Sequence, residues 1–248
     1  YEETIIVDRD KYERFEYKNS LSFYYNLIDF PIVDEYAMLF RNSLLKFIPS
    51  LVIERQKGKI IPTHDIDDIR RFGNFFRNVK TIIGGDLILR KSLKMAYKSF
   101  LQSILISLNR SKDPLVVAIE KLIEVSSKSG LCSEFYFKGL KTGEYDCTYD
   151  IDVPEVKYCM EKISDAKMVV GIHGGFNSVN DDNVFQQEKL RIENVLGKSI
   201  VSGRQHFLKF NIDKTIGIWQ NNGIQYDSTF GHFEREGFKC GTCHEYYM

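Results

Sequence analysis

The chain has 248 residues, 43% of them hydrophobic, so it can bury a large core as one domain of α/β-barrel size or as two smaller ones. Lys and Arg together number 34, as do Asp and Glu, and the formal net charge is zero. This balance indicates neither a nucleic-acid partner nor electrostatic attachment to a membrane surface. No apolar run approaches the roughly 18 residues that a membrane span requires.

The N-terminal part of the chain differs in pattern from the rest. It is rich in Tyr and Phe, and the apolar spacing from Asp34 to Phe47 is typical of an amphipathic helix. We therefore expect residues 1–57 to form a mainly helical extension and residues 58–248 to form the main domain.

From Lys59 onward, strands are predicted to alternate with helices. The predicted strands cover residues 59–63, 133–137, 167–173, 199–203 and 224–226. The predicted helices cover residues 87–108, 114–127, 154–164, 184–196 and 214–221, with Asp113, Asn183 and Asp213 as N-caps of three of them. Serial strand–helix units favour a parallel sheet with right-handed crossovers, either open or closed.

The chain has five cysteines, which are Cys132, Cys147, Cys159, Cys240 and Cys243. An odd number without a visible secretory signal predicts reduced thiols and a cytoplasmic location.

Residues 240–244, Cys-Gly-Thr-Cys-His, match the c-type haem attachment pattern and half of a zinc knuckle. Haem attachment would need an export signal, and a knuckle would need a second ligand pair, which His232 and His244 could supply. A plain structural role for these thiols is the favoured interpretation. A redox function based on Cys240 and Cys243 is an alternative.

The most informative segment is Thr-His-Asp-Ile-Asp-Asp at residues 63–68, at the end of the first predicted strand. Asp65 and Asp67 are two positions apart, so on an extended backbone their side chains point to the same side. They can share one cation or one water, and their mutual repulsion is costly without a metal, a base or a proton. The alternative is an Asp-rich turn that caps the next helix.

Three further predicted strands end in similar chemistry: His173, then Arg204 with His206, then Asp227. In barrels and doubly wound sheets, the ligand site lies at the carboxyl ends of the strands. Carboxylate and imidazole groups are ligands of a borderline divalent metal such as zinc, with an open position for water. Taken singly, His173 is typical of a core histidine, Arg204 of a surface ion pair and Asp227 of a turn or helix cap. Their joint placement favours a metal site.

The order of these motifs resembles that of polysaccharide deacetylases related to family 4 carbohydrate esterases, and more closely a branch found with surface-polysaccharide biosynthesis genes. The matching segments are residues 63–67, 171–176, 203–208, 226–229 and 237–243. Arg-Gln-His and Tyr-Asp-Ser-Thr are the most specific of them. The resemblance extends from about Lys59 to the C-terminus and includes no motif in residues 1–57.

The resemblance implies a distorted (β/α) barrel of about seven strands, with a divalent metal, zinc being the expected ion, at the carboxyl ends of the strands. Asp65 would be the general base, Asp67 and His173 would be metal ligands, Arg204 would orient the base, and Asp227 would lie near the site. The implied function is metal-dependent hydrolysis of an amide bond, which removes an acetyl group from an N-acetylated sugar of a surface polysaccharide or its precursor.

The chain departs from the family pattern in two places. The second metal histidine, expected four residues after the first, is replaced by Asn177, so either His206 supplies the third ligand or the site binds metal weakly. The late strand that would carry a catalytic acid histidine is not evident before Met248, so we expect an incomplete or shortened barrel. The alternative function is that of a catalytically impaired relative that binds saccharide or scaffolds a biosynthetic complex.

Overall fold

The structure, a computed structural model, describes residues 2–6, 8–52, 58–109, 112–141, 143–146 and 149–247. Its centre is a parallel sheet with the strand order β1-β2-β3-β4-β5. The strands are β1 (Thr63–Ile66), β2 (Glu134–Phe137), β3 (Val169–Gly174), β4 (Ser202–Gln205) and β5 (Tyr226–Asp227). The predicted α/β fold with a parallel sheet is confirmed. The described residues supply five strands, with β1 and β5 at the sheet edges, where a barrel of about seven was expected.

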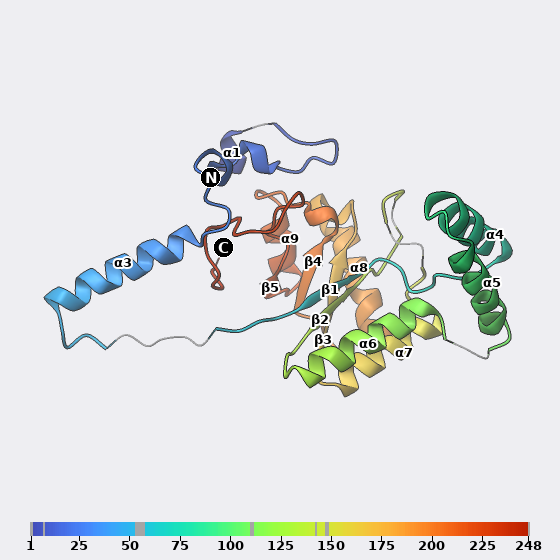
Figure 1. Ribbon diagram of the computed structural model, residues 1–248. Coiled ribbons are helices and arrows are strands. Elements are labelled where there is room, and N and C mark those ends of the chain that lie inside the picture. The colour runs from blue at the N-terminus through green and yellow to red at the C-terminus, as the bar shows by residue number, and fades with distance from the viewer. Residues whose placement is uncertain are drawn as a thin grey trace.

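Helices precede the sheet and connect its strands (Figure 1). Before β1 lie α1 (Glu2–Ile5), a 3₁₀ turn η1 (Tyr17–Asn19), α2 (Leu21–Tyr24) and α3 (Ile32–Phe47). Between β1 and β2 lie α4 (Phe75–Val79), a π-helical segment η2 (Lys80–Leu89), α5 (Leu93–Ser107) and α6 (Pro114–Lys128). The later connections contain α7 (Pro154–Asp165), η3 (Ser178–Asn180), α8 (Asp182–Leu196), η4 (His206–Leu208) and α9 (Thr215–Asn221). None of these helices combines the length and apolar character needed to cross a bilayer.

The first strand lies further along the chain than the sequence predicts. Residues 60–61 are exposed, and Pro62 has no N–H to donate to a neighbouring strand. Pairing therefore begins where the Pro62 carbonyl accepts the N–H of Glu134 at 2.9 Å. As a result, Asp65 lies within β1 and Asp67 follows it directly.

Three predicted helix features are wrong. The single helix expected over residues 87–108 is broken at Lys91, whose φ of 48° lies in the left-handed region. The N-cap of α8 is Asp181 and not Asn183, because the Asp181 carboxylate accepts the N–H of Val184 in the first turn of the helix. Asp213 caps no helix in the described structure, since α9 begins two residues later without a side-chain cap.

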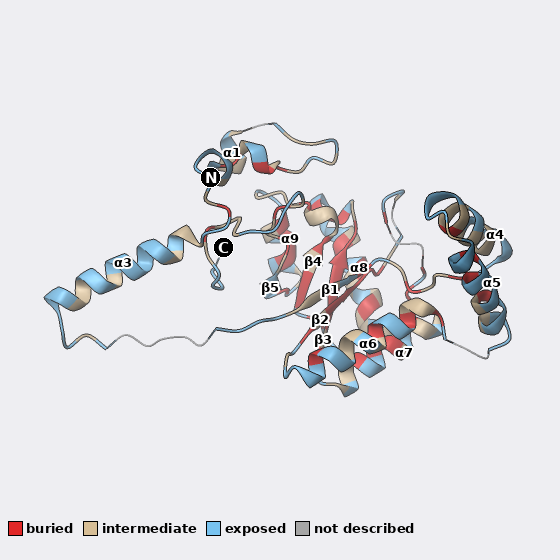
Figure 2. Cartoon of the chain, viewed as in Figure 1, coloured by how far each residue is buried: buried red, intermediate tan, exposed pale blue. Residues whose placement is uncertain are grey.

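The strand register separates the side chains of the sheet into two faces. Ile66, Phe137, Ile172 and Gly203 lie side by side in one row that is directed into the core, where buried residues gather (Figure 2). The helices contribute Val116, Ile119, Val156, Met160, Ile163, Phe185, Ile192 and Trp219 to this core. Because side chains alternate along a strand, the next position on each strand points to the opposite face. That face carries the polar groups described below.

Asp113 joins the start of α6 to the segment that follows β1. It is the N-cap, as predicted, and its buried carboxylate accepts the N–H groups of Leu115, Arg71 and Phe72, each at 2.9 Å.

We expect Asp113→Ala to lower the free energy of unfolding by about 2 kcal/mol or more, because the cap and two long-range acceptor contacts are lost. Urea denaturation measures this change. The control Asp213→Ala should change it by less than about 0.5 kcal/mol, and equal losses would contradict the assignment.

Candidate metal centre

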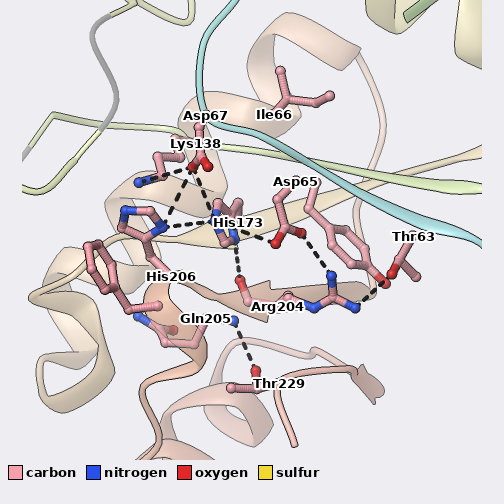
Figure 3. Close-up of polar contacts among 12 residues, drawn as sticks. Thr63, Asp65, Ile66, Asp67, Lys138, His173, Arg204, Gln205, His206 and Thr229 are labelled. Atoms are coloured by element: carbon pink, nitrogen blue, oxygen red, sulfur yellow. Dashed lines mark hydrogen bonds and ion pairs between the residues drawn. The ribbon is translucent and has the colours of Figure 1, made fainter. Parts of the chain in front are cut away.

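Three strand ends bring Asp67, His173 and His206 together (Figure 3). The Oδ1 atom of Asp67 lies 3.4 Å from Nε2 of His173 and 3.6 Å from Nδ1 of His206, and these two nitrogens are 3.0 Å apart. Oxygen and nitrogen ligands placed tetrahedrally around zinc are separated by about 3.4 Å. The spacing and chemistry of the three atoms therefore fit one divalent ion.

The outer nitrogens of both imidazoles are held by backbone carbonyls. His173 Nδ1 lies 2.9 Å from the carbonyl oxygen of Arg204, and His206 Nε2 lies 2.8 Å from that of Tyr145. A carbonyl can only accept, so these two nitrogens carry the protons. In the neutral rings, the inner nitrogens then present lone pairs to each other and to Asp67. Such a triangle of acceptors requires a positive charge, either a proton shared by the rings or a metal cation.

The protonation of the cluster is set by its own contacts and by burial. The His173 ring, which donates to the carboxylate when the shared proton lies on its Nε2, is the main cause that lowers the pKa of Asp67 to about 2. Burial, followed by repulsion from the Lys138 ammonium, lowers the pKa of His206 to about 4. Asp67 is therefore a carboxylate and His206 a neutral imidazole near pH 7, which are the forms that bind a metal.

Asp65 lies beside this cluster and is oriented by Arg204. Its Oδ2 atom is 4.0 Å from His173 Nε2, and its Oδ1 atom accepts a hydrogen bond from Arg204 Nη1 at 3.1 Å. The same guanidinium donates to Thr63 Oγ1 at 2.7 Å and to the Ser228 carbonyl at 3.1 Å. Arg204 thus holds one oxygen of Asp65 and leaves the other directed toward the metal ligands.

Asp227 is the predicted site residue that the structure keeps apart from the cluster. It pairs in register with Gly203, whereas Arg204 lies on the opposite face, and on the edge strand β5 Asp227 is exposed. The Asp227 carboxylate accepts the N–H of Thr229 at 2.7 Å, and Thr229 Oγ1 accepts the N–H of Gln205 at 2.9 Å. Asp227 therefore forms a turn that supports the end of β4.

Sequence analysis missed a buried charged group next to the metal ligands. Lys138 is only 1% exposed, and its Nζ lies 3.7 Å from both Asp67 Oδ1 and Asp146 Oδ1. Glu188 lies in the same region, accepts the N–H of Gly175 at 2.9 Å, and has its pKa raised to about 7 by burial. The sequence contained a signal for Lys138, because it is a polar residue directly after an apolar strand. The same pattern was used to predict the site residues at the ends of the other strands.

Asn177, at the position of the missing family histidine, is exposed in the turn after β3. The three-residue cluster found among the described residues contains His206 instead. The third candidate ligand atom of this cluster therefore comes from the end of β4.

A loop of the N-terminal extension contacts the segment that carries His206. The Asp10 carboxylate closes this loop by accepting the N–H groups of Tyr12 and Arg14 at 2.9 and 2.8 Å. Arg14 donates to the carbonyl of Phe207 at 3.1 Å, and the rings of Tyr12 and Phe207 are 4.8 Å apart. Phe207 has a φ of 61°, an unfavourable conformation for a bulky residue, so these contacts stabilise the turn after His206.

Comparisons with known proteins cover parts of the chain. Residues 1–49 match a family of unknown function, DUF7033. The search of curated proteins gave no match. Among solved structures, the chain is similar to a protein from Mycobacterium smegmatis assigned as a polysaccharide deacetylase, with a TM-score of 0.41 and 16% identity over 72% of this chain and 54% of that one. It is also similar to a mutant of a CE4-family pseudoenzyme with restored enzymatic activity, with a TM-score of 0.36 and 16% identity over 45% of this chain and 39% of that one.

The chain thus spans about half the length of the first of these structures and less of the second. The activity, substrate and partners of this protein are therefore proposed from its own residues in the next subsection.

The pKa of His206 predicts how stability depends on pH without added metal. In the unfolded chain the ring takes up a proton below about pH 6.5, but in the folded protein only below about pH 4. The free energy of unfolding should therefore fall as the pH drops from 6.5 to 4, by at most about 3 kcal/mol. Urea denaturation across this range should give a smaller fall for His206→Asn than for the unchanged protein. His244→Asn, at an exposed histidine, should keep the original dependence, and identical profiles for all three proteins would contradict the prediction.

Proposed function

We propose that the protein is a metal-dependent hydrolase that removes the acetyl group from an N-acetylated sugar of a surface polysaccharide or its precursor. The observation that carries this proposal is the triangle of acceptor atoms from Asp67, His173 and His206, with Asp65 beside it. Carboxylate and imidazole ligands in this number favour zinc and leave a position open for water. The sequence resemblance supplies the acetylated sugar as the substrate class.

A metal bound by these three residues would polarise the amide carbonyl and lower the pKa of a bound water. Asp65 would take the proton of that water, and the 4.0 Å between its Oδ2 and His173 Nε2 supports this role. The proton can then pass from Asp65 to the amine nitrogen that leaves. Arg204 fixes the position of Asp65 through a hydrogen bond to its Oδ1. The turn at Asp227 has a supporting role through Thr229 and Gln205.

The test is acetate release from N-acetylated sugar oligomers, measured together with zinc content by mass spectrometry. Asp65→Asn should lower kcat by about 10²- to 10⁴-fold while zinc content is unchanged, because the base is lost and the ligands remain. His206→Asn should lose both zinc and activity. Asp213→Asn, a surface carboxylate, serves as the control and should alter neither. Zinc-loaded protein that releases no acetate from any oligomer would refute the proposal.

One observation favours a second candidate function, that of a non-catalytic saccharide-binding protein. The Lys138 ammonium is buried between Asp67 and Asp146, so part of the negative charge that a metal would neutralise is already balanced. This candidate predicts saccharide binding that a chelator leaves unchanged and that survives Asp65→Asn. Chelator-sensitive binding, measured by calorimetry, would exclude it.

A further inference from the structure

The C-terminal segment at residues 235–243 runs along the chain that leads into α3. Phe238 donates its N–H to the carbonyl of Ile28, and Val33 donates to that of Gly241, both at 2.8 Å. The approach is close at Gly237, where an added Cβ would lie 2.2 Å from the Ile28 side chain. Two parts of the chain far apart in sequence are therefore held together at the base of α3.

The Asp34 carboxylate, in the first turn of α3, meets the motif that the metal centre does not use. Its Oδ1 accepts from Thr242 Oγ1 at 2.7 Å, and its Oδ2 accepts from the N–H of Cys243 at 2.8 Å and from Cys243 Sγ at 3.1 Å. One nitrogen of His244 lies within 4.8 Å of both the Asp34 and the Cys243 ligand atoms. A thiol, an imidazole and a carboxylate thus converge from positions about 200 residues apart.

From this convergence we propose a second metal site, for zinc or a similar thiol-binding divalent ion, with Asp34, Cys243 and His244 as ligands. Thiolate, imidazole and carboxylate are the ligands that zinc takes in proteins. The Cys243 proton now lies between sulfur and a carboxylate oxygen, and the ion would replace it, with release of one proton and no change of oxidation state. Cys240, three residues before Cys243, has the spacing of a zinc-binding Cys pair, but its Sγ contacts the Tyr246 hydroxyl at 2.8 Å and lies outside this cluster.

This ligand set differs from the zinc knuckle that the sequence offered as an alternative to a plain structural role. His232 lies apart from it, with its ring 4.9 Å from that of Tyr17. Asp34 takes its place, because α3 begins against the C-terminal segment. Cys147 lies outside the described residues, and Cys132 is an exposed free thiol.

A metal at this position would fix the base of a helix that has few other attachments. None of the residues of α3 is buried, and the helix projects away from the sheet (Figure 1). Its described contacts with the C-terminal segment involve Val33 and Asp34 in the first turn. Because the ligands come from both segments, the free energy of metal binding would stabilise their contact.

Cobalt distinguishes this site from the first, because only this one contains sulfur. Metal-stripped, fully reduced protein titrated with Co²⁺ should develop a thiolate-to-cobalt charge-transfer band, which added Zn²⁺ abolishes. The band should persist in His173→Asn, which alters the first site, and in Cys132→Ser, which removes an unrelated exposed thiol. Cys243→Ser should lose the band and bind one zinc fewer, and Asp34→Asn should weaken it.

Two results would overturn the proposal: no band in the reduced protein, or a band that remains in Cys243→Ser. Cys243 and His244 are exposed, so Cys243→Ser and His244→Asn should retain the circular dichroism of the unchanged protein. His244→Asn provides a second, thiol-preserving variant, and an unchanged zinc affinity in that variant would also refute the ligand set.

Discussion

The arrangement of the site depends on three acceptor atoms that lie within 3.6 Å of one another. Asp67, His173 and His206 come from different strand ends, and each is kept in place by the parallel sheet. Lone pairs only 3.0 Å apart repel unless a positive charge lies among them. The strands that carry these residues are packed on a buried core. The sheet therefore keeps the three atoms close enough to share one proton or one cation.

Arg204 contacts both the cluster of three acceptor atoms, through His173, and the neighbouring carboxylate of Asp65. Its main-chain carbonyl accepts from His173 Nδ1 and so determines which nitrogen of that ring is free for a metal. Its guanidinium holds Asp65 at the distance where that carboxylate can act on a neighbouring water. Substituting Arg204 would remove only the second interaction, since the first is made by the backbone. The orientations of His173 and Asp65 therefore both depend on Arg204 but are separable by experiment.

The N-terminal extension takes part in the organisation of the site. The loop closed by Asp10 presents Tyr12 and Arg14 to the turn after His206, where Phe207 has a positive φ. A strained turn persists only when surrounding contacts outweigh its cost. The segment that matches DUF7033 therefore stabilises the conformation of a ligand-bearing turn about 190 residues away. Its contribution is mechanical, through packing and one hydrogen bond to a carbonyl.

The sequence by itself determined the alternation of strands and helices, the parallel sheet, and the polar residues at the strand ends. These follow from local patterns: the apolar period, Asp113 before Pro114, and the two-residue spacing of Asp65 and Asp67. The remaining features depend on strand register and on contacts between distant parts of the chain, which local sequence patterns do not encode. Strand register placed Asp227 level with Gly203 and away from the metal-ligand cluster. The fold also brought His206 against His173, and Pro62 shifted the start of the first strand to Thr63. Contacts such as Lys138 with Asp67, or Asp34 with Cys243, join residues with no sequence relation, so only the folded chain could reveal them.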